Sequence, residues 1–165
     1  MKRAPVVTVR PRSSADDDAI VALSRPSFGK YSPAPERSVW GMMQSRGART
    51  LVAEAGGRVL GFAIVSFEAL ARPFGPWARP VIASLDAIAV HQGAQGAGIG
   101  RALLDGVEGV ARAEGAVSIN LRTAVTNTRA QALFRRAGFQ ATVQIQGFYR
   151  GGQGAFAMTK LLAAA

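Results

Sequence analysis

The sequence predicts a single α/β or α+β domain spanning residues 1–165, in which helices cover a sheet. Runs with strand-like and helical patterns alternate through the middle of the chain, as this fold class requires. Two β-patterned runs, 50–55 and 58–67, are joined by Gly56-Gly57, which predicts a hairpin. A third strand-like run, 81–90, leads through a glycine-rich turn into a helix whose apolar residues recur three and four positions apart.

The N-terminal part is predicted to contain a short strand and two helices. Residues 6–10 are rich in β-formers, and a serine at 13–14 then caps a helix. The aspartates at 16–18 fill its first turn, where their charges favour the helix dipole; a metal site is less favoured because no second cluster of ligands follows. Residues 26–35 contain three prolines and a glycine, which predicts a loop, and a second helix is expected over 36–45.

The C-terminal part is predicted to complete the sheet. Residues 68–80 are rich in proline and should form a loop before the central strand. A strand is expected over 117–123, followed by a helix that Thr126 or Asn127 caps. A last strand is expected over 155–162.

Four closely spaced glycines follow the central strand and predict an anion site. Glycines at 93, 96, 98 and 100 allow main-chain N–H groups to converge on one point, and the helix that follows adds its unpaired N–H groups. A Walker loop is excluded because Ile99, Gly100 and Arg101 stand where lysine and a hydroxyl would be needed. The dinucleotide fingerprint fails as well, because its spacing and its downstream acid are missing.

Composition narrows the class of protein. The chain has no cysteine, which excludes disulfides, thiolate catalysis and cysteine-bound zinc. Its 20 basic and 10 acidic residues give a formal charge of +10, but no run of four Lys or Arg occurs. A general surface bias that suits an anionic cofactor is therefore favoured over a nucleic-acid face. No apolar run could span a bilayer, so no membrane partner and a cytoplasmic location are expected.

Two motifs carry a resemblance to a known family. The glycine loop matches a Gln/Arg-x-x-Gly-x-Gly/Ala pattern at Gln95, Gly98 and Gly100. About 30 residues on, a second pattern, Asn-x-x-Ala-x-x-Leu-x-x-x-x-Gly-Phe, is matched at five positions, namely Asn127, Ala130, Leu133, Gly138 and Phe139. Both patterns, in this order, resemble the GCN5-related N-acetyltransferases, the GNAT family.

The resemblance implies a fold and a donor. It implies a mixed, mostly antiparallel sheet of six or seven strands flanked by about four helices, with a splay between the fourth and fifth strands. The implied activity is transfer of acetyl from acetyl-CoA to a primary amine by direct attack in a ternary complex, without a metal. The implied cofactor-binding residues are Ile88, Ala89, Val90, Gln95, Gly96, Ala97, Gly98, Ile99, Gly100, Arg101, Asn127, Ala130 and Phe134.

Asp86 and Tyr149 are the candidate catalytic residues. Asp86 interrupts the apolar central strand, and desolvation there would raise its pKa toward that of a useful base. In the resembled family an acid at this place often takes the amine proton; a structural or substrate-orienting role is the alternative. The family's usual tyrosine is Phe134 here, which cannot donate a proton. Tyr149, expected on the next strand, is the candidate acid. The alternatives are that Tyr149 is an ordinary core or groove-wall residue and that the thiolate leaves without a protein acid.

The acceptor is less determined. By resemblance, Phe28, Tyr31 and Trp40 lie near an acceptor groove, although single aromatics are often core residues. Trp77 could line a pocket or anchor its loop. A small amine or a peptide N-terminus is favoured over a polycation because few acids are available. Alternatives are a non-catalytic acyl-CoA sensor and an enzyme acting on charged RNA; a homodimer is left open.

Overall fold

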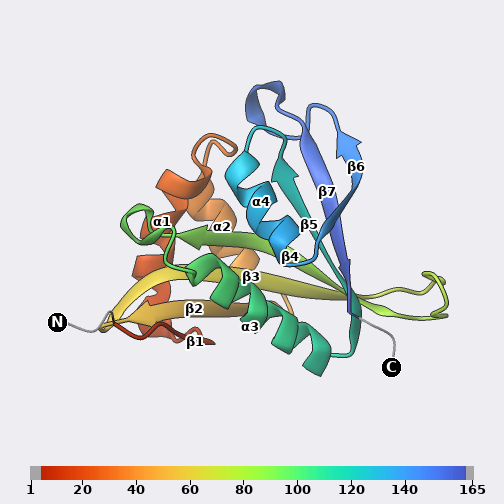
Figure 1. The fold of residues 1–165 in the computed structure, drawn as a ribbon, viewed down its shortest axis with the longest axis horizontal. Helices are drawn as coiled ribbons and strands as arrows, with labels where there is room; N and C mark the ends of the chain where they lie inside the picture. The colour runs from red at the N-terminus through yellow and green to blue at the C-terminus, as the bar shows by residue number, and fades with distance from the viewer. Residues whose placement is uncertain (1–4, 163–165) are drawn as a thin grey trace.

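The structure is a computed structural model that describes residues 5–162. Its centre is a seven-stranded sheet with the order β1-β2-β3-β4-β5-β7-β6 (Figure 1). All neighbouring strands are antiparallel except β4 and β5, which are parallel. The strands are β1 Thr8–Pro11, β2 Arg49–Ala55, β3 Arg58–Ala69, β4 Val81–Val90, β5 Ala116–Ala124, β6 Gln140–Ile145 and β7 Ala155–Leu161.

Helices cover both faces of this sheet, as Figure 1 shows. Their bounds are α1 Asp17–Phe28, α2 Pro35–Gln44, α3 Ile99–Ala113 and α4 Thr128–Arg136. On one face, Ile20 of α1 and Val39 of α2 pack on Phe62. On the other, Leu103 of α3 and Phe134 of α4 join a larger cluster. The predicted mixed sheet with about four helices is therefore confirmed for the described part of the chain. None of the helices within residues 5–162 is long and apolar enough to cross a bilayer.

A β-bulge at Asp86 changes the direction of the central strand. Val65 of β3 pairs with Leu85, but Ile64 pairs with Ala87, so Asp86 is an extra residue in β4. Ala83 and Leu85 belong to the cluster under α3, whereas Ala87 and Ala89 belong to the cluster under α1 and α2. The bulge lies in the middle of β4. Odd-numbered side chains before it face α3, and odd-numbered side chains after it face α1 and α2.

The parallel strands β4 and β5 separate directly beyond this point. Their pairing ends at Leu85 and Leu121, although β4 continues to Val90 and β5 to Ala124. The backbone edges of the two free segments face a gap instead of each other. The splay expected between the fourth and fifth strands is confirmed.

Two local expectations were wrong. Residues 26–28 are not loop, because α1 continues through Pro26 to Phe28. Proline in a last turn removes a single N–H donor, and the Gly29 N–H still donates to the Arg25 carbonyl at 2.9 Å. Tyr149 is not on a strand either: it lies in the loop between β6 and β7, just before a 3-10 turn at Arg150–Gly152.

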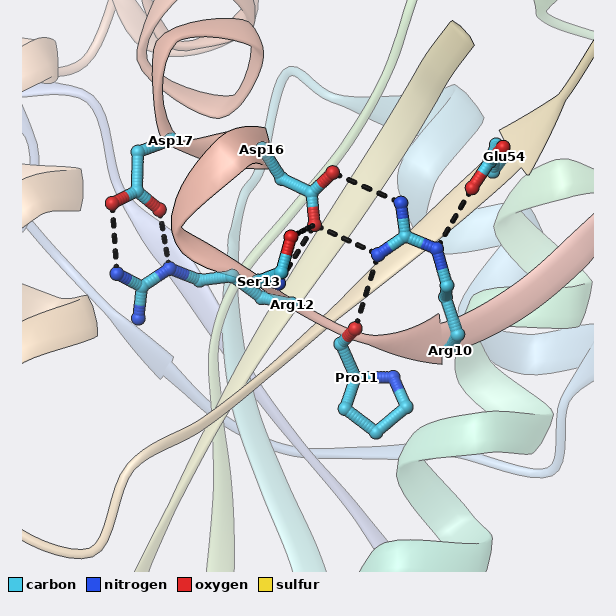
Figure 2. Close-up of polar contacts among 7 residues, drawn as sticks. All are labelled: Arg10, Pro11, Arg12, Ser13, Asp16, Asp17 and Glu54. Carbon is cyan, nitrogen blue, oxygen red and sulfur yellow. Dashed lines mark hydrogen bonds and ion pairs between the residues drawn. The ribbon is translucent and has the colours of Figure 1, made fainter. Parts of the chain in front are cut away.

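The first helix is fixed to the sheet edge by ion pairs rather than by its dipole alone (Figure 2). The Asp16 carboxylate, 6% exposed, accepts hydrogen bonds from both Nη atoms of Arg10 at 2.8 and 2.9 Å. It also accepts from the Ser13 N–H at 2.8 Å, while Arg10 Nε donates to Glu54 of β2 at 2.8 Å. Arg12 and Asp17 form a second pair beside it. Arg10 lowers the pKa of Asp16 from 3.8 to about 2.

We expect Asp16→Asn to lower the free energy of unfolding at pH 7 by about 1–2 kcal/mol, because charge-assisted hydrogen bonds are lost at a buried site. A carboxyl whose pKa is depressed by folding stabilises above its unfolded pKa. The wild-type advantage should therefore disappear as the pH falls from about 4 toward 2. Urea titrations measure this. Asp105→Asn, at an exposed pair with Arg101, is the matched control and should change little. Equal losses in both variants would contradict the assignment.

Candidate functional site

A groove of about 920 Å³ passes through the gap between β4 and β5. Residues 85–90 of β4 and 121–124 of β5 form its sides. Phe28 and Tyr31 line it from the α1–α2 side of the sheet, and residues of α3 and α4 line it from the other. The splay of the strands thus connects the two faces of the sheet by one continuous groove.

The glycine loop forms one end of the groove. Gly96 and Gly98 have φ angles of 84° and 80°, which side-chain-bearing residues rarely adopt, and α3 begins at Ile99 directly afterwards. The first N–H groups of α3 have no acceptors within the helix, and the residues that carry them line the groove. The Gln95 side chain reaches back to the Val90 carbonyl at 3.4 Å. The loop has the geometry of an anion site at a helix N-terminus.

The second motif fixes α4 beside this loop. The Asn127 side chain caps α4, accepting a hydrogen bond from the Ala130 N–H at 3.1 Å. A Cβ on Gly100 would lie 2.9 Å from Leu133 Cδ2, so glycine there permits the close approach of α3 and α4. Phe134, 4% exposed, packs against Phe139 with ring centroids 5.9 Å apart. These residues position the wall of the groove.

Most of the predicted cofactor residues line this one groove. They are Ile88, Ala89, Val90, Gln95, Gly96, Gly98, Ile99, Gly100, Arg101, Asn127, Ala130 and Phe134; Ala97 is not among the lining residues. Gln131 had not been singled out from the sequence. Its buried amide donates to the carbonyls of Ala124 and Val125 at 2.9 and 3.0 Å, which fixes α4 to the end of β5. The sequence predicts that Gln131 lies in a helix, but the spacing of apolar residues gives no signal for a hydrogen bond between its side chain and the end of a strand.

Asp86 lies where the two strands separate. Its position in the bulge turns the side chain into the groove, where it remains accessible to solvent. The surrounding walls still remove part of its hydration, and this desolvation raises the pKa of Asp86; a hydrogen bond with Ser66 opposes the rise. A carboxylate with a raised pKa in an open groove is suited to accept a proton from a ligand.

Aromatic side chains gather at the α1–α2 end of the groove. The rings of Tyr31 and Tyr149 are 5.1 Å apart, and Phe148 packs edge-on against Tyr149 at 4.8 Å. The guanidinium of Arg122, on β5, lies 5.4 Å from the centre of the Phe148 ring. Burial raises the pKa of Tyr149, with Tyr31 adding to the rise and Arg122 opposing it. The phenol therefore keeps its proton at neutral pH.

Trp40 and Trp77 lie apart from this groove. Val39 and Met43 of α2 face the core, whereas Trp40, next along the helix, is 44% exposed and lines a different hollow beside Asp17 and Asp18. Trp77 stacks on Phe74 within the loop before β4, which projects at the far end of the sheet (Figure 1). Met42, rather than Trp40, lines the groove from α2.

A sequence model described as the acetyltransferase (GNAT) family matches residues 18–139. The chain belongs to this family. It is accordingly an acyl-CoA N-acyltransferase, and the matched region contains β2 to β5, both glycine-loop and α4 motifs, and Asp86. A search of curated proteins finds no match. Within residues 5–162, no group of three or more His, Cys, Asp or Glu could hold a metal ion.

Solved structures of GNAT proteins share the fold over nearly the whole chain. The ribosomal-protein-S18-alanine N-acetyltransferase from Escherichia coli is 22% identical, with a TM-score of 0.76 over 97% of this chain and 96% of that one. A GCN5-related N-acetyltransferase from Kribbella flavida is 29% identical, with a TM-score of 0.74 over 94% and 97%. Arabidopsis thaliana NAA60 in complex with acetyl-CoA is 16% identical, with a TM-score of 0.78 over 94% and 98%.

We expect Gly98→Ala to weaken binding of coenzyme A by about tenfold, because a side chain at this positive φ forces the loop to change shape. Gly115→Ala is the matched control. Gly115 lies just beyond the other end of α3, has a φ of 76° and, like Gly98, has open space around it. Both variants should lose similar stability, but only Gly98→Ala should change the Kd in calorimetric titrations. Equal affinities would show that the loop does not hold the donor.

Proposed function

We propose that this GNAT protein transfers the acetyl group of acetyl-CoA to a primary amine, by direct attack in a ternary complex. The observation that carries the proposal is the single groove, which joins the glycine loop at one end to Asp86 and Tyr149 at the other. A donor whose phosphates bind at the loop can therefore extend through the sheet. Its thioester then lies close to the Asp86 carboxylate and the Tyr149 phenol, where the acceptor also binds.

The donor is held mainly by backbone. Its pyrophosphate binds the N–H groups of the glycine loop and the first turn of α3. Its pantetheine arm lies along the free edge of β4 beyond Leu85, where β5 no longer pairs. The amides of that arm can then take the hydrogen bonds that a neighbouring strand would make. A main-chain N–H between Ile88 and Val90 donates a hydrogen bond to the thioester oxygen as negative charge develops on that oxygen.

Asp86 and Tyr149 move the protons. The neutral amine nitrogen attacks the thioester carbon, the C–S bond breaks, and the amide product and coenzyme A form. Asp86 accepts the proton that the attacking nitrogen loses, through a water molecule. Tyr149 gives its proton to the departing sulfur and recovers one from solvent. The absence of cysteine from the chain excludes an acetyl-cysteine intermediate.

The acceptor proposed is a small amine or a peptide N-terminus. The E. coli neighbour acts on the alanine of ribosomal protein S18, according to its name, which supports a peptide N-terminus. The residues lining the groove include one carboxylate, Asp86, so a polycationic acceptor has little to bind. A non-catalytic sensor would bind acetyl-CoA without releasing thiol, and an enzyme acting on charged RNA would lose activity steeply with salt.

We expect Asp86→Asn to lower kcat by about 100-fold or more, because the general base is lost. In the wild type, activity should rise with pH as Asp86 loses its proton, and because the pKa of Asp86 is raised, this rise should occur above the pH range of an ordinary aspartate. In Asp86→Asn, only the rise caused by deprotonation of the acceptor amine should remain. Thiol release with saturating acetyl-CoA measures both. Asp18→Asn, at an exposed aspartate outside the groove, should retain full activity. A pH profile unchanged in Asp86→Asn would remove Asp86 from the mechanism.

Tyr149→Phe keeps the ring contacts with Tyr31 and Phe148 but removes the donor. We expect kcat to fall by about tenfold to 100-fold with no change in the affinity for acetyl-CoA. Because the pKa of Tyr149 is raised, the wild-type activity should persist to strongly alkaline pH before the phenol ionises. Full activity of Tyr149→Phe would show that the thiolate leaves without a protein acid.

A further inference from the structure

Arg122 and Asp86 occupy corresponding positions on the two sides of the gap. Each directly follows the residue at which β4 and β5 stop pairing with each other, Leu121 in β5 and Leu85 in β4. Both leucines belong to the cluster under α3 and α4. Side chains alternate along strands, so Arg122 lies on the opposite face, the face on which Tyr31 and Tyr149 line the groove. The acceptor end thus has a carboxylate on one strand and a guanidinium on the other.

The surroundings of Arg122 leave its hydrogen-bond donors available. Its guanidinium is close to the Phe148 ring, and the side chain is otherwise exposed to the groove. It forms none of the ion pairs found within residues 5–162, although many other arginines of the chain do, among them Arg10, Arg12, Arg25, Arg49, Arg101 and Arg112. Aromatic contact covers a face of a guanidinium and leaves its edge N–H groups free for a planar anion.

The other cations of the groove have different positions. Arg129 and Arg136 belong to α4, on the glycine-loop side of the sheet, and Arg101 is occupied by Asp105 and the Arg136 carbonyl. Lys30 lies in the connection between α1 and α2, next to Tyr31 in the chain, and is a lysine, which lacks the planar fork of a guanidinium. Among the side chains that the structure describes, Arg122 is therefore the arginine that lines the acceptor end, and its charge opposes the rise in the pKa of Tyr149.

We propose that Arg122 binds a carboxylate of the acceptor, so that the acceptor class is an amine that also carries a carboxylate. The inference rests on the proposed function, because it assigns a partner to the acceptor that Asp86 deprotonates. Two N–H groups of Arg122 hold the two carboxylate oxygens, and this orients the amine toward Asp86 and the thioester. A free α-amino acid and a peptide with an acidic residue near its N-terminus both supply this group, whereas a polyamine lacks it and is repelled.

Matched acceptors that differ by the carboxylate test the inference. Thiol release from acetyl-CoA is measured with phenylalanine against phenethylamine, and with leucine against 3-methylbutylamine. Two short peptides, with glutamate or glutamine at the second position, separate the free amino acid from the peptide as source. We expect at least one carboxylated member to exceed its partner in kcat/KM by about tenfold or more, the gain typical of a charge-assisted pair.

Variants of Arg122 test whether this side chain causes the preference for a carboxylated acceptor. Arg122→Gln should abolish the preference by raising KM for the carboxylated acceptor much more than KM for its uncharged partner, with KM for acetyl-CoA unchanged. Arg122→Lys should retain part of the preference. Arg135→Gln, which removes an equal charge from an exposed position of α4 outside the groove, should leave it intact. Turnover without a carboxylate preference, or a preference that survives Arg122→Gln, would overturn the inference. No turnover with any amine would instead overturn the proposed function.

Discussion

The site depends on the separation of β4 and β5 after Leu85 and Leu121. Two parallel strands in the middle of a sheet would ordinarily satisfy each other's backbone groups along their full length. The bulge at Asp86 turns β4 at the place where that pairing stops, and α4 then packs over the α3 side. The open edge of β4 leaves main-chain donors and acceptors for a ligand in the centre of an otherwise closed sheet.

The two ends of the resulting groove differ in chemistry. The glycine-loop end presents backbone N–H groups from residues with positive φ and from the start of α3, which suits phosphate. The other end presents a carboxylate, a phenol and a guanidinium among aromatic rings. Such a groove suits an anionic donor and an amine without any run of four Lys or Arg in the sequence, and the overall charge of +10 need not indicate nucleic acid.

The sequence predicted the structure of the glycine-loop end of the groove better than that of the other end. The glycine loop, the α4 cap at Asn127 and the interrupting Asp86 are local signals, because each depends on residues within one strand–turn–helix segment. The other end brings together Tyr31 after α1, Arg122 of β5 and Phe148 of a loop in which glycines at 147, 151 and 152 have positive φ. Such contacts between distant segments leave no periodic signal. Trp40 was expected near the acceptor groove by resemblance to the family. Its neighbours Val39 and Met43 face inward, but a helix turns about 100° per residue, so Trp40 is exposed and lies outside the groove.

Hydrogen–deuterium exchange with and without acetyl-CoA tests most directly whether the donor occupies the gap. Amides of residues 86–90 and 96–101 should exchange more slowly in the complex, because the pantetheine arm and the phosphates cover them. Residues 17–22 of α1, which include lining residues of the hollow at Trp40 and none of the groove, should be unaffected. Protection confined to that hollow, or binding that leaves residues 86–90 unchanged, would contradict the placement of the donor between β4 and β5.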